Sequence, residues 1–171
     1  MNKTDTLNII KYYSSLYMKE QFFLVSIITL PISVIFFVVS LYFDVISYDI
    51  FVSFTPILFG ALVLFFAYLK TNRFKNMIFL QEKVLNVSFD NEKLYPIYPK
   101  TLFYFSNSWF IKSGCWAFHK SYLNSIKVLL VNEKNPSMHY IVKLYTVEGY
   151  VITDHSMHSG EIKKMKAWYN G

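Results

Sequence analysis

Three side chains near the C-terminus could do metal chemistry. Asp154, His155 and His158 bring one carboxylate and two imidazoles into a short segment, and such a ligand set can bind zinc. The spacing matches no specific zinc motif, and no other histidine is close in the sequence. We therefore expect a solvated loop before the last helix, and no metal or cofactor is predicted.

A cysteine and a histidine form the second constellation. Cys115 and His119 would share one face of a strand, where a thiolate and an imidazole can cooperate in nucleophilic catalysis. Four residues of strand span about 13 Å, which is too far for a hydrogen bond, so Cys115 is predicted to be a small core residue. A single cysteine forms no internal disulfide, and nothing points to an oxidising compartment. With no other catalytic signature in the chain, we expect a protein that is not an enzyme.

Cations are the third group of interest, because residues 70–171 contain fourteen Lys and Arg but only seven Asp and Glu. The densest groups follow the second apolar run and lie near the C-terminus. As candidates for contact with a lipid surface we single out Lys70, Arg73, Lys75, Lys163, Lys164 and Lys166. Anionic lipid attracts each well-placed cation by roughly 1 kcal/mol. The other reading of the last three is a solvated helix face, and without a basic motif nucleic acid is not an expected partner.

Two apolar runs, residues 22–43 and 50–69, precede these cations and determine where in the cell they lie. Neither run contains a charged side chain, and each is long enough as a helix to cross about 30 Å of hydrocarbon. Only 16% of the 171 residues are charged, whereas about a quarter is usual in soluble proteins. The first run is too long for a cleavable signal peptide, so the sequence predicts a transmembrane hairpin.

Lysine and arginine flank the two outer ends of this hairpin, whereas the connecting segment between its helices lacks them. Lys3, Lys11 and Lys19 precede the first run, Lys70, Arg73 and Lys75 follow the second, and the connecting segment 44–49 has none. By the positive-inside rule, we expect a multi-pass inner-membrane protein with cytoplasmic N- and C-termini. A transporter is disfavoured because neither run contains an ionisable residue, while homo-oligomers through the hairpin are allowed.

Within the hairpin, Pro31, Pro56 and Gly60 predict kinks, with helix packing as the ordinary reason for such residues. The segment 1–21 is predicted to be cytoplasmic. Its apolar residues recur at helical spacing, which fits either an interfacial helix or an N-terminal extension of the first span.

The segment 70–171 is predicted to be one cytoplasmic β-rich domain. Alternating patterns and turn residues place strands at 83–89, 94–98, 101–105, 109–112, 115–119, 125–131, 139–146 and 150–153, with turns at 90–91, 106–108, 113–114, 135–137 and 148–149. We expect Phe103 and Phe105 to share one face, and Tyr104 and Phe110 to face outward.

A short helix is predicted to end the chain, with Ser159 as its N-terminal cap and Gly171 after its last turn. Ile162, Met165 and Trp168 form one apolar stripe, which should dock on the sheet. The predicted fold is a membrane α-hairpin plus an α+β domain, a small antiparallel β-barrel or sandwich of about seven strands capped by a C-terminal helix.

This order of elements, centred on LFYFSNSWFIKSGCWAFHKSYLNSIKVLL, resembles bacterial pleckstrin-homology-like (PH-like) domains, including the YcxB-like group, in which the domain follows a two-helix membrane hairpin. The likeness covers roughly residues 83–170 and lies in the strand 109–111, Gly114, and the polar Lys120-Ser121 before a strand near Ile126. It implies a membrane-tethered interaction module. The partners would be the bilayer, anionic lipid headgroups, or an unidentified membrane or cytoplasmic protein. The basic cluster of phosphoinositide-binding relatives is reduced here to Lys93.

The architecture also resembles the two-transmembrane β-barrel effectors of anti-phage signalling, which implies a cyclic-nucleotide sensor that oligomerises in the membrane. The Trp-Gly-Tyr and Gly-x-Tyr-Thr-Arg patterns expected there are absent, and no arginine follows Arg73. A phosphate would depend on lysines or backbone N–H groups, which are less suited to bidentate recognition. An interior packed with aromatic side chains would favour the interaction module, and an open pocket lined by Lys and Tyr would favour the sensor.

Overall fold

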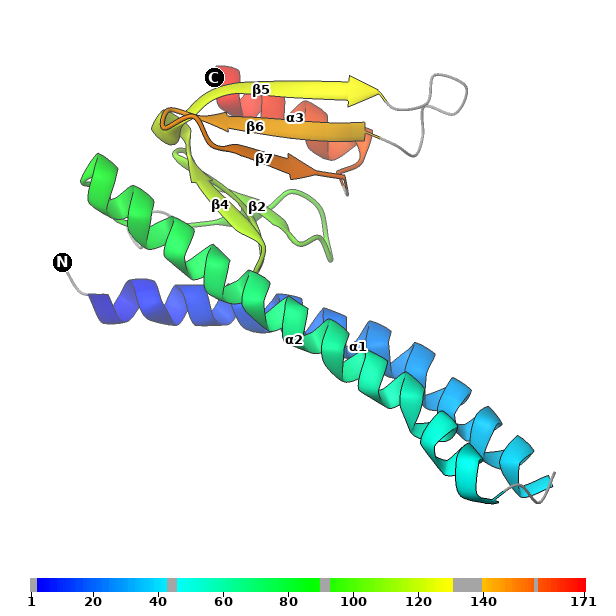
Figure 1. Cartoon of the computed structure of the whole chain (residues 1–171). Helices are drawn as coiled ribbons and strands as arrows, with labels where there is room; N and C mark the ends of the chain where they lie inside the picture. The colour runs from blue at the N-terminus through cyan, green and yellow to red at the C-terminus, as the bar shows by residue number, and fades with distance from the viewer. Residues whose placement is uncertain (1–2, 43–45, 90–92, 131–139, 156) are drawn as a thin grey trace.

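The structure is a computed structural model that describes residues 3–42, 46–89, 93–130, 140–155 and 157–171. Two helices of 40 residues each, α1 (Lys3–Tyr42) and α2 (Ile46–Leu85), form an antiparallel hairpin (Figure 1). All strands and the last helix, α3 (Ser159–Asn170), gather in a head at the end of the hairpin that holds the N-terminus. The hairpin therefore projects from the head as a long arm.

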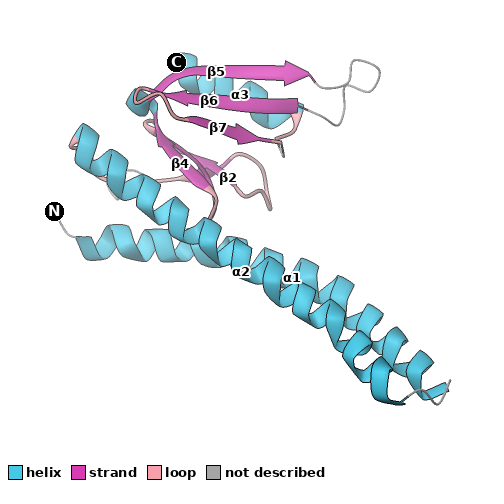
Figure 2. Cartoon of the chain, viewed as in Figure 1, coloured by secondary structure: helices cyan, strands magenta, loops and turns pink. Residues whose placement is uncertain are grey.

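The head contains two antiparallel sheets (Figure 2). Sheet A has the order β1 (Tyr95–Pro96), β2 (Phe103–Phe105), β3 (Trp109–Lys112) and β4 (Trp116–His119). Sheet B has the order β5 (Leu123–Leu130), β6 (Tyr140–Thr146) and β7 (Val151–Asp154). Within the part of the chain that the structure describes, seven strands and a final helix confirm the coarse prediction. The barrel alternative is wrong for the described residues, because the two sheets do not close on each other.

Aromatic and aliphatic side chains fill the space between the two sheets. This core contains Phe103, Phe110, Trp116, Phe118, Val142 and Leu144, and α3 adds Ile162 and Met165 from its predicted stripe. Phe110 is 1% exposed, so its predicted outward orientation is wrong. The cause is the register: Phe110 pairs with Phe105 and Phe118, and cross-strand partners share a face.

The opposite face of sheet A packs on the two long helices. Ile10 and Tyr13 of α1 and Phe74 and Ile78 of α2 contact Trp109, Ile111 and Ala117. The ring of Tyr104 meets the ring of Tyr13 edge-on at 4.8 Å between centroids, so Tyr104 leaves the inner core as predicted but lies under α1. Sheet A is thus covered on both faces, and the helix ends belong to the fold of the head.

The predicted strand 83–89 is wrong, because α2 continues to Leu85 and Asn86 follows it with a left-handed φ of 53°. Its buried face recurs at helical spacing through Phe74, Ile78, Gln81 and Glu82. The alternating apolar residues near Val84 matched a strand only locally. The turn predicted at 90–91 lies outside the described residues, as does the one at 135–137.

α1 runs unbroken from Lys3, which favours the N-terminal extension over a separate interfacial helix. The predicted cap of α3 is wrong by one residue, since His158 is the N-cap and Ser159 begins the helix. Gly171 follows the last turn as predicted, and its N–H donates to the Ala167 carbonyl at 3.0 Å.

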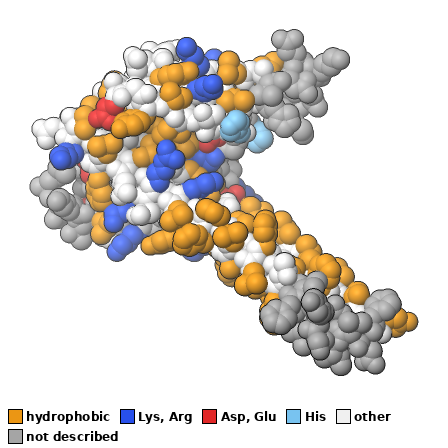
Figure 3. Space-filling model, viewed as in Figure 1, with side chains coloured by type: hydrophobic (Ala, Val, Ile, Leu, Met, Phe, Trp, Pro, Cys, Tyr) orange, Lys and Arg blue, Asp and Glu red, His pale blue; other side chains and the backbone are white. Residues whose placement is uncertain are grey.

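The arm presents an apolar surface to its surroundings (Figure 3). Phe22 and Phe23 are each 62% exposed, and similar side chains continue along both helices to Val39 and from Phe54 to Leu69. By length and composition both helices suffice to cross a membrane. They touch at Gly60, where an added Cβ would lie 2.8 Å from the Val25 side chain, so this glycine serves close packing.

Candidate functional site

A groove lies where the arm enters the head. It has a volume of about 500 Å³, and its walls come from α1, α2, the β1–β2 loop, the β3–β4 turn and the start of α3. Six residues define what we call the junction groove: Tyr17, Gln21, Lys70, Lys100, Lys112 and Cys115. An adjoining hollow of about 170 Å³ shares Lys70, Lys112 and Cys115 and adds Arg73 and Asp154. In Figure 3, basic side chains gather where the head meets the arm.

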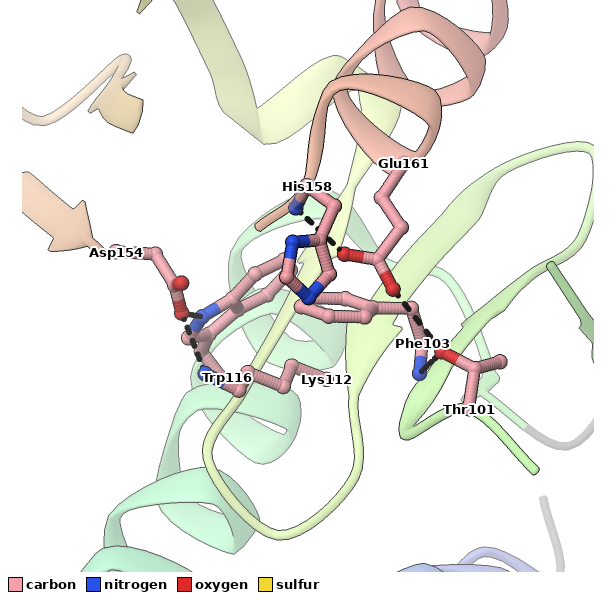
Figure 4. A network of polar contacts seen from close by, with 7 residues as sticks. All are labelled: Thr101, Phe103, Lys112, Trp116, Asp154, His158 and Glu161. Atoms are coloured by element: carbon pink, nitrogen blue, oxygen red, sulfur yellow. Dashed lines mark hydrogen bonds and ion pairs between the residues drawn. The ribbon is translucent and has the colours of Figure 1, made fainter. Parts of the chain in front are cut away.

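Asp154 fixes one wall of this groove. Its Oδ2 accepts hydrogen bonds from Lys112 Nζ at 2.9 Å and from Trp116 Nε1 at 2.8 Å (Figure 4). Because Asp154 is 6% exposed and Lys112 only 15%, this ion pair is shielded from water, and breaking it would leave a buried charge. The pair connects the end of β7 to the end of β3 and therefore holds sheet B against sheet A at the groove.

Glu161 fixes the second wall. Its carboxylate accepts the His158 backbone N–H at 2.9 Å and the Thr101 hydroxyl at 3.3 Å, and the Thr101 hydroxyl oxygen accepts the Phe103 N–H at 3.1 Å (Figure 4). A carboxylate in the first turn also interacts favourably with the helix dipole. The β1–β2 loop is thereby tied to the start of α3.

The β3–β4 turn forms the floor and lies directly on α1. Gly114 has a φ of 65°, and a Cβ there would stand 2.6 Å from the Tyr17 Cβ, so only glycine fits this contact. Next to it, Cys115 lies beside the Tyr17 side chain in the groove lining. Burial raises the pKa of the Cys115 thiol above its ordinary value, although Lys112, Tyr17 and Lys70 oppose the shift. The thiol is thus kept protonated, which disfavours a nucleophilic role.

Lys100 reaches the groove from an unusual backbone conformation. Its φ is 61°, and it follows Pro99 in a turn in which the Thr101 N–H bonds the Tyr98 carbonyl at 3.4 Å. Proline at the second position and a positive φ at the third define a type II turn, where glycine or asparagine is favoured. A lysine here has a backbone cost, which points to a use for its side chain.

The structure brings together only part of the predicted lipid-contact set. Lys70 and Arg73 line the groove and its adjoining hollow. Lys75 lies over the Phe79 ring at 5.8 Å, and Lys164 donates to the Ile97 carbonyl at 2.7 Å; neither lysine lines the groove. Lys163 and Lys166 are exposed on α3, and neither residue lines the groove.

Sequence reasoning missed Lys100 and Lys112 as members of the site. Lys100 carried a usable signal, because Pro99-Lys100 reads as a turn that favours a smaller residue. Lys112 carried none, since its partner Asp154 is 42 positions away.

The two chemical constellations considered first have other roles. Asp154 pairs with Lys112 and Trp116, and the described residues contain no cluster of three His, Cys, Asp or Glu that could hold a metal ion. His119 Nδ1 accepts the Ser121 N–H at 3.2 Å, and its ring stands edge-on to Trp109 at 5.1 Å. His119 therefore caps the short 3-10 helix Lys120–Tyr122 that follows β4.

Comparison of the chain with protein-family models, curated proteins and solved structures found no match. What the protein does must therefore be inferred from its arm and its groove.

Proposed function

We propose that this chain is an integral inner-membrane protein that presents its head at the cytoplasmic surface as an interaction module for lipid headgroups or a partner protein. The observation that carries this proposal is the apolar surface of the arm, which begins at Phe22 and ends at Leu69, where both helices enter the head. Exposed apolar surface of this extent is unfavourable in water. In a bilayer the same surface meets hydrocarbon.

The arrangement of the head supports a PH-like module. Four strands, three strands and a closing C-terminal helix make the architecture that the resemblance implies. The region between the sheets is filled by Phe103, Phe110, Trp116 and Phe118, which supports a binding role for the outer surface. The nucleotide-sensor alternative expects an open interior, and this packing speaks against a ligand site between the sheets. The pocket lined by Lys and Tyr lies instead outside the sheets, in the junction groove.

The anchoring and the orientation are tested by thiol labelling in intact cells. In a Cys115→Ser background, one cysteine is introduced into the connecting segment 44–49 and another at exposed Tyr150. We expect an impermeant maleimide to label the first site from outside, and the second only after the cells are opened. The protein should stay in membranes washed with alkaline carbonate. Labelling of position 150 from outside, or release by carbonate, would contradict the proposal.

A further inference from the structure

We propose that the junction groove binds the phosphate of an anionic phospholipid from the bilayer that holds the arm. This inference rests on the proposed function, because it requires the arm to be inserted in lipid. It goes beyond general attraction between a basic surface and a membrane, since it assigns the headgroup to the junction groove with its adjoining hollow. Three cations would bind it: Lys100 of the groove, Arg73 of the hollow, and Lys70, which lines both.

The groove lies at the height of lipid headgroups. Lys70 and Arg73 follow Leu69, the last residue of the apolar surface, by about 1.5 and 6 Å along the helix axis. Gln21, on the opposite wall, directly precedes the exposed Phe22. Each headgroup layer is about 5 to 8 Å thick, so this part of the groove is immersed in it.

The cations of the groove and of its adjoining hollow are available to a ligand. Lys70, Arg73 and Lys100 form no ion pair within the part of the chain that the structure describes. Lys112 is instead held by Asp154, so it forms a fixed wall.

Two of the three nearby carboxylates already accept hydrogen bonds. Asp154 accepts from Lys112 and Trp116, and Glu161 accepts from Thr101 and the His158 backbone. Glu20 lies on the α1 wall and is exposed, so it adds one negative charge at the rim. Glu161 keeps its charge because its hydrogen-bond donors are neutral, so an incoming phosphate would meet three cations against two carboxylates, Glu20 and Glu161.

The conformation of Lys100 is a separate observation that favours a ligand. The turn would form with less strain if glycine stood at this position, yet the chain has a lysine there, which lines the groove together with Lys70. A phospholipid suits this position better than a soluble phosphate, because the bilayer keeps its headgroups at this height at a high local concentration.

The test counts bound phosphatidylglycerol by native mass spectrometry. Full-length protein is reconstituted with phosphatidylcholine and phosphatidylglycerol and then released gently in neutral detergent. We expect the wild type to retain phosphatidylglycerol, and K70Q/K100Q to bind it about 25-fold more weakly, at about fivefold for each cation. The charge-preserving K70R/K100R should keep most of the binding.

The matched control is K163Q/K166Q, which removes the same charge from the exposed face of α3. Retention by this control supports the groove, whereas an equal loss in both pairs would overturn it in favour of diffuse attraction. Unchanged binding in K70Q/K100Q, or displacement of the lipid by free glycerol phosphate, would also overturn it. Carbonate washing of the same variants separates the two proposals. Release of the wild-type protein from the membrane would contradict the anchoring. If the proteins stay in the membrane and K70Q/K100Q binds as much phosphatidylglycerol as the wild type, only the groove proposal is contradicted.

Discussion

The side chain of Gln81 substitutes for a neighbouring strand at the free edge of β4. Its Oε1 accepts the His119 N–H at 2.7 Å, and its Nε2 donates to the Ala117 carbonyl at 2.8 Å. These are the backbone groups that point away from β3, and Gln81 is 0% exposed. An unpaired sheet edge invites association with other chains. A helix covers this edge here, and one amide satisfies its hydrogen bonds.

Replacing Gln81 by methionine keeps the volume and removes the amide. We expect Q81M to lower the free energy of unfolding by about 2 to 4 kcal/mol, because a buried N–H and a buried carbonyl lose their partners. Denaturant unfolding in detergent, followed by near-UV circular dichroism, measures the change. N76A, at an exposed position of the same helix, is the control and should change it by less than about 0.5 kcal/mol. Equal behaviour of the two variants would show that the edge does not depend on Gln81.

Comparing two glycines with positive φ distinguishes the cost of backbone strain from the cost of a steric clash with α1. G114A and G149A both place a Cβ on a left-handed residue, which costs roughly 1 to 2 kcal/mol. At Gly149 nothing lies within 4 Å, whereas at Gly114 the Cβ meets Tyr17. We therefore expect G114A to be less stable than G149A by about 1 to 3 kcal/mol in the same unfolding measurement. A difference near zero would mean that the β3–β4 turn does not rest on α1.

For single residues, the sequence predicts where a side chain lies relative to the apolar runs better than it predicts which side chain it contacts. Lys70 and Arg73 were identified because they follow an apolar run, which is a local property. The contacts of Lys112 with Asp154 and of Gln81 with β4 join residues separated by 36 positions or more. Such pairs have no local signal, since they exist only after the sheets and helices have packed.

Among the elements, α1 and α2 change their environment along their length. Their outer parts expose apolar residues, and their inner parts bury Ile10, Tyr13, Phe74 and Ile78 against sheet A. The strands from β1 to β7 were predictable because turn residues separate short alternating runs. The end of α2 was not, because a short apolar run fits both periods, and only packing against β4 selects the helix.

The contact between α1 and β2 should respond to alkaline pH. Burial raises the pKa of Tyr104 above 10.0, and the nearby Tyr12 adds to the shift. The unfolded chain then loses this proton first, so the stabilising contribution is present below about pH 10 and declines as pH rises through the folded-state pKa. We expect the unfolding midpoint to fall between about pH 9 and pH 12, and less steeply in Tyr104→Phe. Tyr95→Phe, at an exposed site, should follow the wild type. Identical slopes in all three proteins would contradict this assignment.

Over the whole molecule, the head cannot swing freely on the arm. No linker separates them, because both helices continue from the apolar surface into the core under sheet A. In the proposed arrangement, with the arm inserted in a bilayer, helix length therefore sets the height of the junction groove above the hydrocarbon. A domain on a flexible linker would sample many heights, whereas this one is presented at a single height.

That rigidity allows the height to be changed without changing the groove. Seven helix-forming residues inserted after Gln21 and seven after Leu69 add about two turns to each helix. The head is raised by about 10 Å, and it keeps nearly the same rotational orientation about the helix axes as in the wild type. Every groove residue is retained, but the groove leaves the headgroup layer. We expect this variant to keep wild-type circular dichroism and carbonate resistance, and to retain as little phosphatidylglycerol as K70Q/K100Q. If instead the raised head held the lipid as tightly as the wild type, its ligand would not depend on the height that the arm imposes, and binding in the headgroup layer would be wrong.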